Sequence, residues 1–173
     1  MAPSSQSFEA KQFSAEVVQV IDAPLARVIP LLSPQGEYEW IPGWDYVAVH
    51  PKDKNLPMAK YGVFVEDFIP KKLYGVDVGP ATWYVADVNP KARSGLLVVG
   101  TRISMKLVEA QVQALRENRT EVRYRWTVTT LNEEGNKIVG DHFDEKIEMV
   151  LTALMKALRH YCEKGEKLSY WLL

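Results

Sequence analysis

The strongest constraint on the fold is a change in hydrophobic period towards the C-terminus. From Val122 to Val128 every second residue is apolar or aromatic and the residues between them are polar, which is the period-2 pattern of a strand with one buried face. Residues 141–164 instead follow helical spacing. Their apolar stripe comprises Phe143, Ile147, Val150, Leu151, Leu154, Leu158 and Tyr161. A sheet with one apolar face is therefore followed by one long helix that can cover it.

Further segments share the β-branched and aromatic composition of strands, and each is bounded by Pro, Gly, Asn or charged residues. With the segment already described, the expected strands lie at 14–21, 44–49, 61–68, 81–88, 94–100, 102–113 and 121–130. Within the sixth of these, the apolar phase shifts between Leu107 and Val108. That shift predicts a β-bulge.

Two short helices are expected between the first two strands. Residues 24–32 keep helical spacing but contain Pro30, which predicts a kink or an early end. A second helix at 35–40 should end at the Pro42-Gly43 turn signal. The order of elements predicts an α+β fold, with an antiparallel sheet covered by the C-terminal helix and space for an apolar cavity between them.

Four stretches of sequence, together with this order of elements, carry a resemblance to a known superfamily. The stretches are Glu37-Tyr38-Glu39-Trp40-Ile41-Pro42-Gly43-Trp44, Thr82-Trp83-Tyr84-Val85, Leu131-Asn132-Glu133-Glu134-Gly135-Asn136 and Leu158-Arg159-His160-Tyr161. Over about residues 14–166 the chain resembles the SRPBCC superfamily, the START-like and birch-pollen-allergen-like proteins. It is most similar to their polyketide cyclase-like and uncharacterised bacterial members.

The resemblance implies a helix-grip fold. In that fold a curved seven-stranded antiparallel sheet wraps around the long C-terminal helix, and two short helices lie between strands 1 and 2. A hydrophobic cavity is implied between sheet and helix, with its entrance near the short helices. Carriers and enzymes both occur on this fold, so the resemblance does not choose between them.

Composition and charge narrow the functional classes. The chain has 173 residues and a formal net charge of −1, which excludes a globally basic nucleic-acid binder. We expect one domain at 14–166, with a disordered N-terminal tail at 1–13 and a C-terminal tail at 167–173. No apolar run is long enough to span a bilayer, and the first residues do not have the pattern of a secretory signal. With a single cysteine, Cys162, nothing calls for an oxidising compartment, so a cytoplasmic location is expected.

Aromatic side chains are the first candidates for a binding site, because they can line a pocket and stack on a ligand. Plain core packing is the alternative for each of them. The residues expected to line the cavity are Tyr38, Trp40, Trp44, Trp83 and Trp126, with Phe143, Ile147 and Leu151 from the long helix.

Candidates for catalysis are fewer. Glu37 and Tyr38 would lie near the cavity entrance, where a carboxylate beside a phenol could act as an acid–base pair, and Tyr38 is expected to face the cavity more than Glu37. His142 lies beside Asp141 at the start of the long helix. A solvated surface position is the alternative for Glu37 and His142.

No motif indicates a metal or a cofactor. The three histidines, His50, His142 and His160, are dispersed, and no H-x-x-x-H, C-x-x-C, P-loop, G-x-G-x-x-G or G-x-S-x-G motif is present. We therefore expect neither a metal site nor a cofactor.

Three functions stay open at this point. The first is binding, and by extension transport, of a hydrophobic or amphipathic small molecule in the cavity. The second is catalysis of the polyketide cyclase or dehydratase type by acid–base residues in that cavity. The third is a protein-interaction module with a filled core. Exposed strand edges and Trp171 in the C-terminal tail also favour a homodimer.

Overall fold

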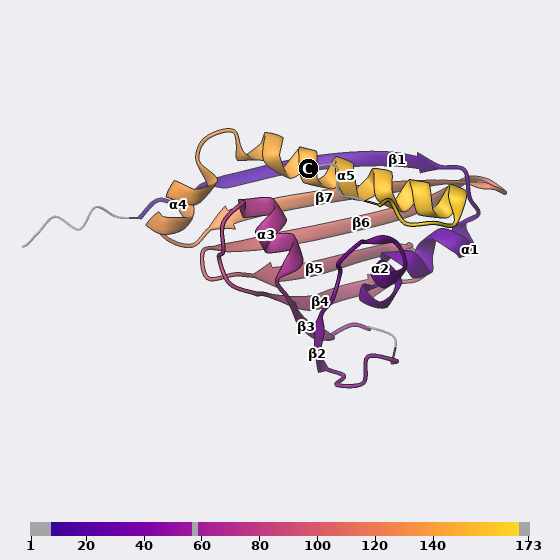
Figure 1. Cartoon of the computed structure of the whole chain (residues 1–173), viewed down its shortest axis with the longest axis horizontal. Coiled ribbons are helices and arrows are strands. Elements are labelled where there is room, and N and C mark those ends of the chain that lie inside the picture. Colours follow the sequence, from indigo (N-terminus) through magenta and orange to yellow (C-terminus); the bar gives the residue numbers. More distant parts are fainter. Residues whose placement is uncertain (1–7, 57–58, 170–173) are drawn as a thin grey trace, which may run out of the picture.

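The computed structural model describes residues 8–56 and 59–169. Residues 1–7 of the expected N-terminal tail at 1–13 and residues 170–173 of the expected C-terminal tail at 167–173, which include Trp171 and the dimer contact based on it, lie outside these residues. Within them, seven strands form one antiparallel sheet in the order β1-β7-β6-β5-β4-β3-β2 (Figure 1). The strands are β1 (Gln12–Ile21), β2 (Val47–His50), β3 (Val63–Glu66), β4 (Ala81–Asn89), β5 (Ser94–Gly100), β6 (Ser104–Arg116) and β7 (Arg119–Thr130).

Strands β2 to β7 follow one another across the sheet, and β1 adds to β7 at the far edge. The first strand thus lies beside the last. The predicted strands are confirmed in number and order, and β1 begins two residues before the expected start at 14.

The helices lie on one face of this sheet. They are α1 (Leu25–Val28), α2 (Pro34–Trp40), α3 (Phe68–Tyr74), α4 (Glu133–Val139) and α5 (Phe143–Lys164). In Figure 1, α5 runs along β1 and β7, and α2 and α3 cover part of the rest of that face. The predicted stripe of α5 is buried against the sheet, with Ile147, Leu151 and Leu158 fully inaccessible to solvent.

The two short helices between β1 and β2 are also confirmed. After α1 the chain continues as a 3-10 turn over Ile29–Leu32, because Pro30 cannot continue an α-helix from an interior position. Sequence reasoning did not predict α3. The expected strand at 61–68 ends at Glu66, whose carboxylate accepts a hydrogen bond of 2.8 Å from the Ile69 N–H in the first turn of α3.

The predicted bulge between Leu107 and Val108 is wrong. Strand β6 keeps its register with both neighbours there, since Leu107 pairs with Val98 and Thr127 and the next residue pairs with the next partners. Met105 and Leu107 point to the outer face of the sheet, where they are 39% and 41% exposed. Lys106 takes the inward position between them. The apolar phase shift therefore results from a buried lysine rather than from an inserted residue.

Helix α2 packs unusually closely on the segment before it, and Gly36 makes this possible. A Cβ atom at Gly36 would overlap the carbonyl oxygen of Pro30 and lie 2.5 Å from the Cα of Leu31. The Ser33 side chain caps the helix by accepting a hydrogen bond from the Gly36 N–H. These contacts fix the position of Glu37, the next residue.

Gly36→Ala should lower the free energy of unfolding by about 1–3 kcal/mol, because overpacking against backbone atoms cannot be relieved by a change of rotamer. The measurement is urea denaturation followed by circular dichroism. Gly95→Ala is the matched control, since a Cβ there would meet only the Asp87 carbonyl oxygen at 4.0 Å. Equal stability of the two variants would contradict the close packing of α2.

Candidate functional site

A lysine lies on the inner face of the sheet, which is otherwise apolar at this point. Lys106 is 4% exposed and sits opposite Val99 on β5 and Val128 on β7. Its Nζ atom lies 3.9 Å from the centroid of the Trp126 ring and 4.5 Å from that of the Trp83 ring. Within residues 8–56 and 59–169, no hydrogen bond or ion pair is made by this ammonium group. The ammonium group contacts two indole faces, where a buried lysine would usually contact a carboxylate.

Trp83 connects Lys106 to a buried carboxylate. Glu66 is 3% exposed, and its two oxygens accept 2.8 Å hydrogen bonds from the Trp83 Nε1–H and from the Ile69 N–H. The indole of Trp83 therefore has an anion at its N–H edge and a cation at its face, an arrangement that polarises the ring in the favourable sense. Burial raises the pKa of Glu66, while the Ile69 hydrogen bond and the Lys106 charge oppose that rise.

Two further side chains complete what we call the buried polar cluster, which consists of Glu37, Glu66, Lys106 and Tyr124. Burial, followed by the charge of Glu66, raises the pKa of Glu37 well above its usual value, and the Lys106 charge opposes this. Burial and the charge of Glu37 raise the pKa of the Tyr124 hydroxyl. Burial lowers the pKa of Lys106 to about 8, against the charges of both carboxylates. Burial therefore favours the uncharged form of both groups, the carboxylic acid of Glu37 and the amine of Lys106.

Several polar atoms of this interior lack partners. The Tyr46 hydroxyl and the Trp126 Nε1–H are buried and make no hydrogen bond within the described chain. Neither the Glu37 carboxyl nor the Tyr124 hydroxyl has a hydrogen-bond partner among the same residues. The first two groups are fully inaccessible, and each such group without a partner costs about 1–3 kcal/mol, which favours a ligand or ordered water beside them.

Small residues lie beside Tyr124 on the inner face of the sheet. Across the sheet Tyr124 is opposite Ala110 on β6, and Ala110 is opposite Gly95 on β5, so all three share one face. A Cβ atom added to Gly95 would meet nothing closer than a backbone oxygen at 4.0 Å. The two smallest residues of the row thus lie beside Tyr124.

The surface hollows lie outside the space between α5 and the sheet. One of 360 Å³ opens at the ends of β2 and β3, where the otherwise buried Tyr46 and Glu66 are among the residues that line it, and Asp45, Asp67 and Lys71 also contribute. Others of 400 and 230 Å³ lie on the outer face of the sheet, and one of 300 Å³ lies on the outer side of α5. None of these four lies between α5 and the sheet.

The structure divides the predicted tryptophans into two pairs, all of them buried. Trp40 and Trp44 donate through their indole N–H groups to the carbonyl oxygens of Leu31 and Pro34, at 2.8 and 3.0 Å. They therefore hold α2 in place. Trp83 and Trp126 instead form the walls around Lys106.

Glu37 and Tyr38 face opposite directions. Glu37 joins the buried polar cluster, whereas the Tyr38 hydroxyl donates to the Asp45 carboxylate near the surface. The Lys54 ammonium donates to the Tyr38 hydroxyl at 2.8 Å and to Asp45 at 3.0 Å. These three side chains link the α2–β2 segment to the loop after β2.

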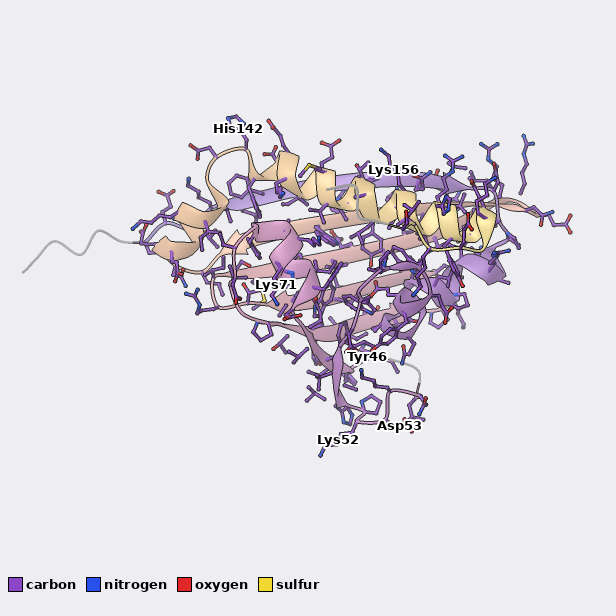
Figure 2. All side chains as sticks on the ribbon, in the orientation of Figure 1. Tyr46, Lys52, Asp53, Lys71, His142 and Lys156 are labelled. Atoms are coloured by element: carbon purple, nitrogen blue, oxygen red, sulfur yellow. The ribbon has the colours of Figure 1, made fainter. Side chains whose placement is uncertain are left out.

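The residues predicted on α5 lie in two environments. His142 precedes the helix in a left-handed conformation, with φ 63°, and its side chain is 79% exposed and 3.5 Å from the Glu145 carboxylate. Figure 2 shows it pointing away from the sheet. Phe143 stacks on Tyr74 with centroids 5.6 Å apart, and it is buried in the helix stripe with Ile147 and Leu151.

Sequence reasoning missed Lys106 and Glu66. The signal for Lys106 was present, because continuing the alternation of Val108 and Val112 backwards places residue 106 on the inner face. It was overlooked because lysine is rarely buried. No comparable signal existed for Glu66, since its burial depends on α3.

Residues 8–56 and 59–169 contain no cluster of His, Cys, Asp and Glu side chains that could hold a metal ion. In the same residues, no helix is both long enough and apolar enough to cross a bilayer.

No family model matches the sequence, and neither does any curated protein. Solved structures match most of the chain. A START superfamily protein from Mycobacterium smegmatis has a TM-score of 0.64 at 11% identity, covering 88% of this chain and 98% of its own. Norcoclaurine synthase from Thalictrum flavum, in complex with dopamine and hydroxybenzaldehyde, has a TM-score of 0.63 at 12% identity over 91% and 90%. The Zhui aromatase/cyclase from Streptomyces sp. R1128 has a TM-score of 0.59 at 19% identity over 89% and 95%.

The chain also spans 48% of the longer DynU16 protein from the dynemicin biosynthetic locus, with a TM-score of 0.58 at 14% identity. At sequence identities this low, the structural similarity establishes the fold alone. The chain has the helix-grip fold of the START-like proteins, as the sequence predicts.

Lys106→Met should raise the free energy of unfolding at pH 7 by about 1–3 kcal/mol, because a desolvated charge is replaced by an apolar side chain of similar length. The folded pKa of about 8 lies below the ordinary value of 10.5, so between these values the unfolded chain binds the proton and the folded chain does not. Wild-type stability therefore rises with pH through that window, and the advantage of the variant shrinks. Urea denaturation of both proteins at pH 7, 9 and 10.5 measures this difference in the free energy of unfolding.

Lys156→Met on the exposed side of α5 (Figure 2) is the control and should change stability by less than about 0.5 kcal/mol. A loss of stability at pH 7 in Lys106→Met alone would contradict the desolvated state of Lys106.

Proposed function

We propose that this helix-grip protein binds a hydrophobic or amphipathic small molecule in its interior, between the sheet and α5, with the polar group of the ligand at the buried polar cluster. The observation that carries the proposal is the set of interior polar groups without partners. A ligand that hydrogen-bonds them removes a desolvation cost that the unliganded protein bears.

The unpaired groups indicate the chemistry of the ligand's polar end. Lys106, Tyr124, Tyr46 and the Trp126 indole all offer donors, and a protonated Glu37 adds another. Several unpaired donors within one interior favour an acceptor, such as a carbonyl, phenolate or carboxylate oxygen. The apolar part of the ligand would lie against Trp83 and Trp126 and against the buried stripe of Phe143, Ile147 and Leu151 on α5.

The similar structures support this reading at the level of the fold. A START superfamily protein, an aromatase/cyclase and a synthase that holds an aromatic amine and an aromatic aldehyde share the helix-grip arrangement. A single domain at 14–166, a cytoplasmic location and a homodimer stay predictions that accompany the proposal. Tyr38, Trp40 and Trp44 line the proposed binding site only if the ligand extends to the part of the interior that α2 covers.

Ala110→Phe tests the binding site, because it fills the space beside Tyr124 with a ring. Affinity for N-phenyl-1-naphthylamine, a neutral probe that fluoresces in apolar surroundings, should fall at least about tenfold, which corresponds to roughly 1.4 kcal/mol. The affinity is measured by fluorescence titration with energy transfer from tryptophan.

The matched control is Gln111→Phe, one residue further along β6 and on the exposed outer face. It should bind the probe like the wild-type protein. Failure of the wild-type protein to take up the probe would overturn the proposal and favour the interaction module with a filled core.

A second candidate function is acid–base catalysis of the cyclase or dehydratase type. The observation that favours it is the direction of two pKa shifts, since that of Glu37 is raised and that of Lys106 is lowered to about 8. Both groups thus titrate closer to neutral pH than usual, where proton transfer in both directions is efficient. A proton donor and a base facing one ligand are what such a reaction needs.

Glu37→Gln should leave probe affinity unchanged and lower turnover by about a hundredfold, the typical contribution of one general acid. The assay follows condensation of dopamine with 4-hydroxybenzaldehyde by liquid chromatography and mass spectrometry, since a similar structure holds that pair. Glu39→Gln, an exposed position on the same helix, is the control. Equal turnover in Glu37→Gln and wild type would overturn the catalytic role.

A further inference from the structure

We propose that Lys106 forms a covalent imine with the carbonyl carbon of an aldehyde or ketone ligand. The inference deepens the proposed function and rests on it, because the ligand must first enter the interior. It names the class of ligand, a carbonyl compound with an apolar or aromatic body.

The geometry around Lys106 is that of a nucleophilic amine. Its Nζ atom lies 3.9 and 4.5 Å from two indole centroids, and among the described residues no carboxylate contacts it as an ion-pair partner. A salt bridge would hold a lysine in its unreactive ammonium form, whereas indole faces also accommodate the neutral amine. Burial lowers its pKa to about 8, so the neutral form is appreciably populated near pH 7.5.

The groups that face Lys106 supply the other half of the chemistry. They are Glu66 from the end of β3 and Glu37 from α2, and Glu37 in turn acts on Tyr124 from β7. Glu66 is held by hydrogen bonds from Trp83 and Ile69, so it serves as a fixed negative charge that stabilises a cation. Glu37 has no hydrogen-bond partner among the described residues, and burial raises the pKa of its carboxyl.

The reaction balances without any other reactant. The neutral Lys106 amine adds to the carbonyl carbon, a C–N bond forms, and a proton moves from nitrogen to the carbonyl oxygen to give a carbinolamine. Glu37 then donates its proton to the hydroxyl group, the C–O bond breaks, and water leaves. The product is a protonated imine on Lys106 beside the newly formed Glu37 carboxylate, and hydrolysis reverses each step.

The surroundings select the body of the ligand. Trp83 and Trp126 flank the amine with flat apolar surfaces, with their ring centroids 4.5 and 3.9 Å from Nζ. An aromatic aldehyde places its carbonyl carbon at Lys106 and its ring against these indoles.

The test is reductive trapping. The full-length protein is incubated with 2-naphthaldehyde at pH 7.5, reduced with sodium borohydride, digested and mapped by mass spectrometry. Modification at Lys106 should exceed that at the exposed Lys52 and Lys156 (Figure 2) at least about tenfold, because the aldehyde is held in the interior and not at these surface amines. The yield at Lys106 should reach half its maximum near pH 8, the pKa of this amine.

Two variants act as controls. Lys106→Met should lose the dominant adduct and keep its circular dichroism spectrum, and Lys156→Met should keep the adduct. Labelling of Lys52 and Lys156 to the same extent as Lys106, or no adduct at Lys106, overturns the imine.

Binding of N-phenyl-1-naphthylamine, measured without reductant, tests the proposed function separately. Displacement of this probe by 2-naphthaldehyde without a Lys106 adduct overturns the imine and leaves ligand binding standing. If the wild-type protein binds no probe and forms no adduct, both proposals fail.

Discussion

The burial of Lys106 between Trp83 and Trp126 is the interaction on which the candidate site depends. An ammonium group removed from water must be compensated, and here the compensation comes from two indole faces and from carboxylates beyond direct contact. Trp83 is central to this because its N–H edge also binds Glu66. The arrangement keeps the lysine in the interior without neutralising it in a salt bridge, so its charge and its nucleophilic nitrogen stay available to a ligand.

The rest of the fold brings these groups together from distant parts of the chain. Lys106 and Trp83 come from strands in the middle of the sheet, whereas Glu37 arrives on α2, whose place is fixed by the contact of Gly36 with the Pro30–Leu31 backbone. Helix α5 runs along β1 and β7 and covers that part of the same sheet face (Figure 1). The long helix thus supplies apolar wall, and the short elements supply the polar groups.

The fold could be predicted from the sequence because its elements are specified locally. The alternation in 121–130, the helical stripe of 141–164 and the cap at Asn132, which accepts a hydrogen bond from the Gly135 N–H, each act over a few residues. The predictions failed at two places where a residue did not follow the usual preference of its type. The buried Lys106 in β6 gave the same pattern as a bulge, and α3 was not predicted because Glu66, whose carboxylate accepts a hydrogen bond from its first turn, has the pattern of a strand residue.

The sequence alone determined the number and order of strands, the amphipathic helix that covers them and the set of buried tryptophans, since hydrophobic period and turn residues encode all of these. Only the tertiary structure decided which polar residues share the interior. Glu37 and Tyr38 are neighbours in sequence, yet one faces Lys106 and the other faces Asp45. Their directions depend on how α2 packs against the sheet, and the pKa of Lys106 depends on its burial and on the charges of Glu66 on β3 and Glu37 on α2. Such long-range electrostatic and packing relations have no local signature in the chain.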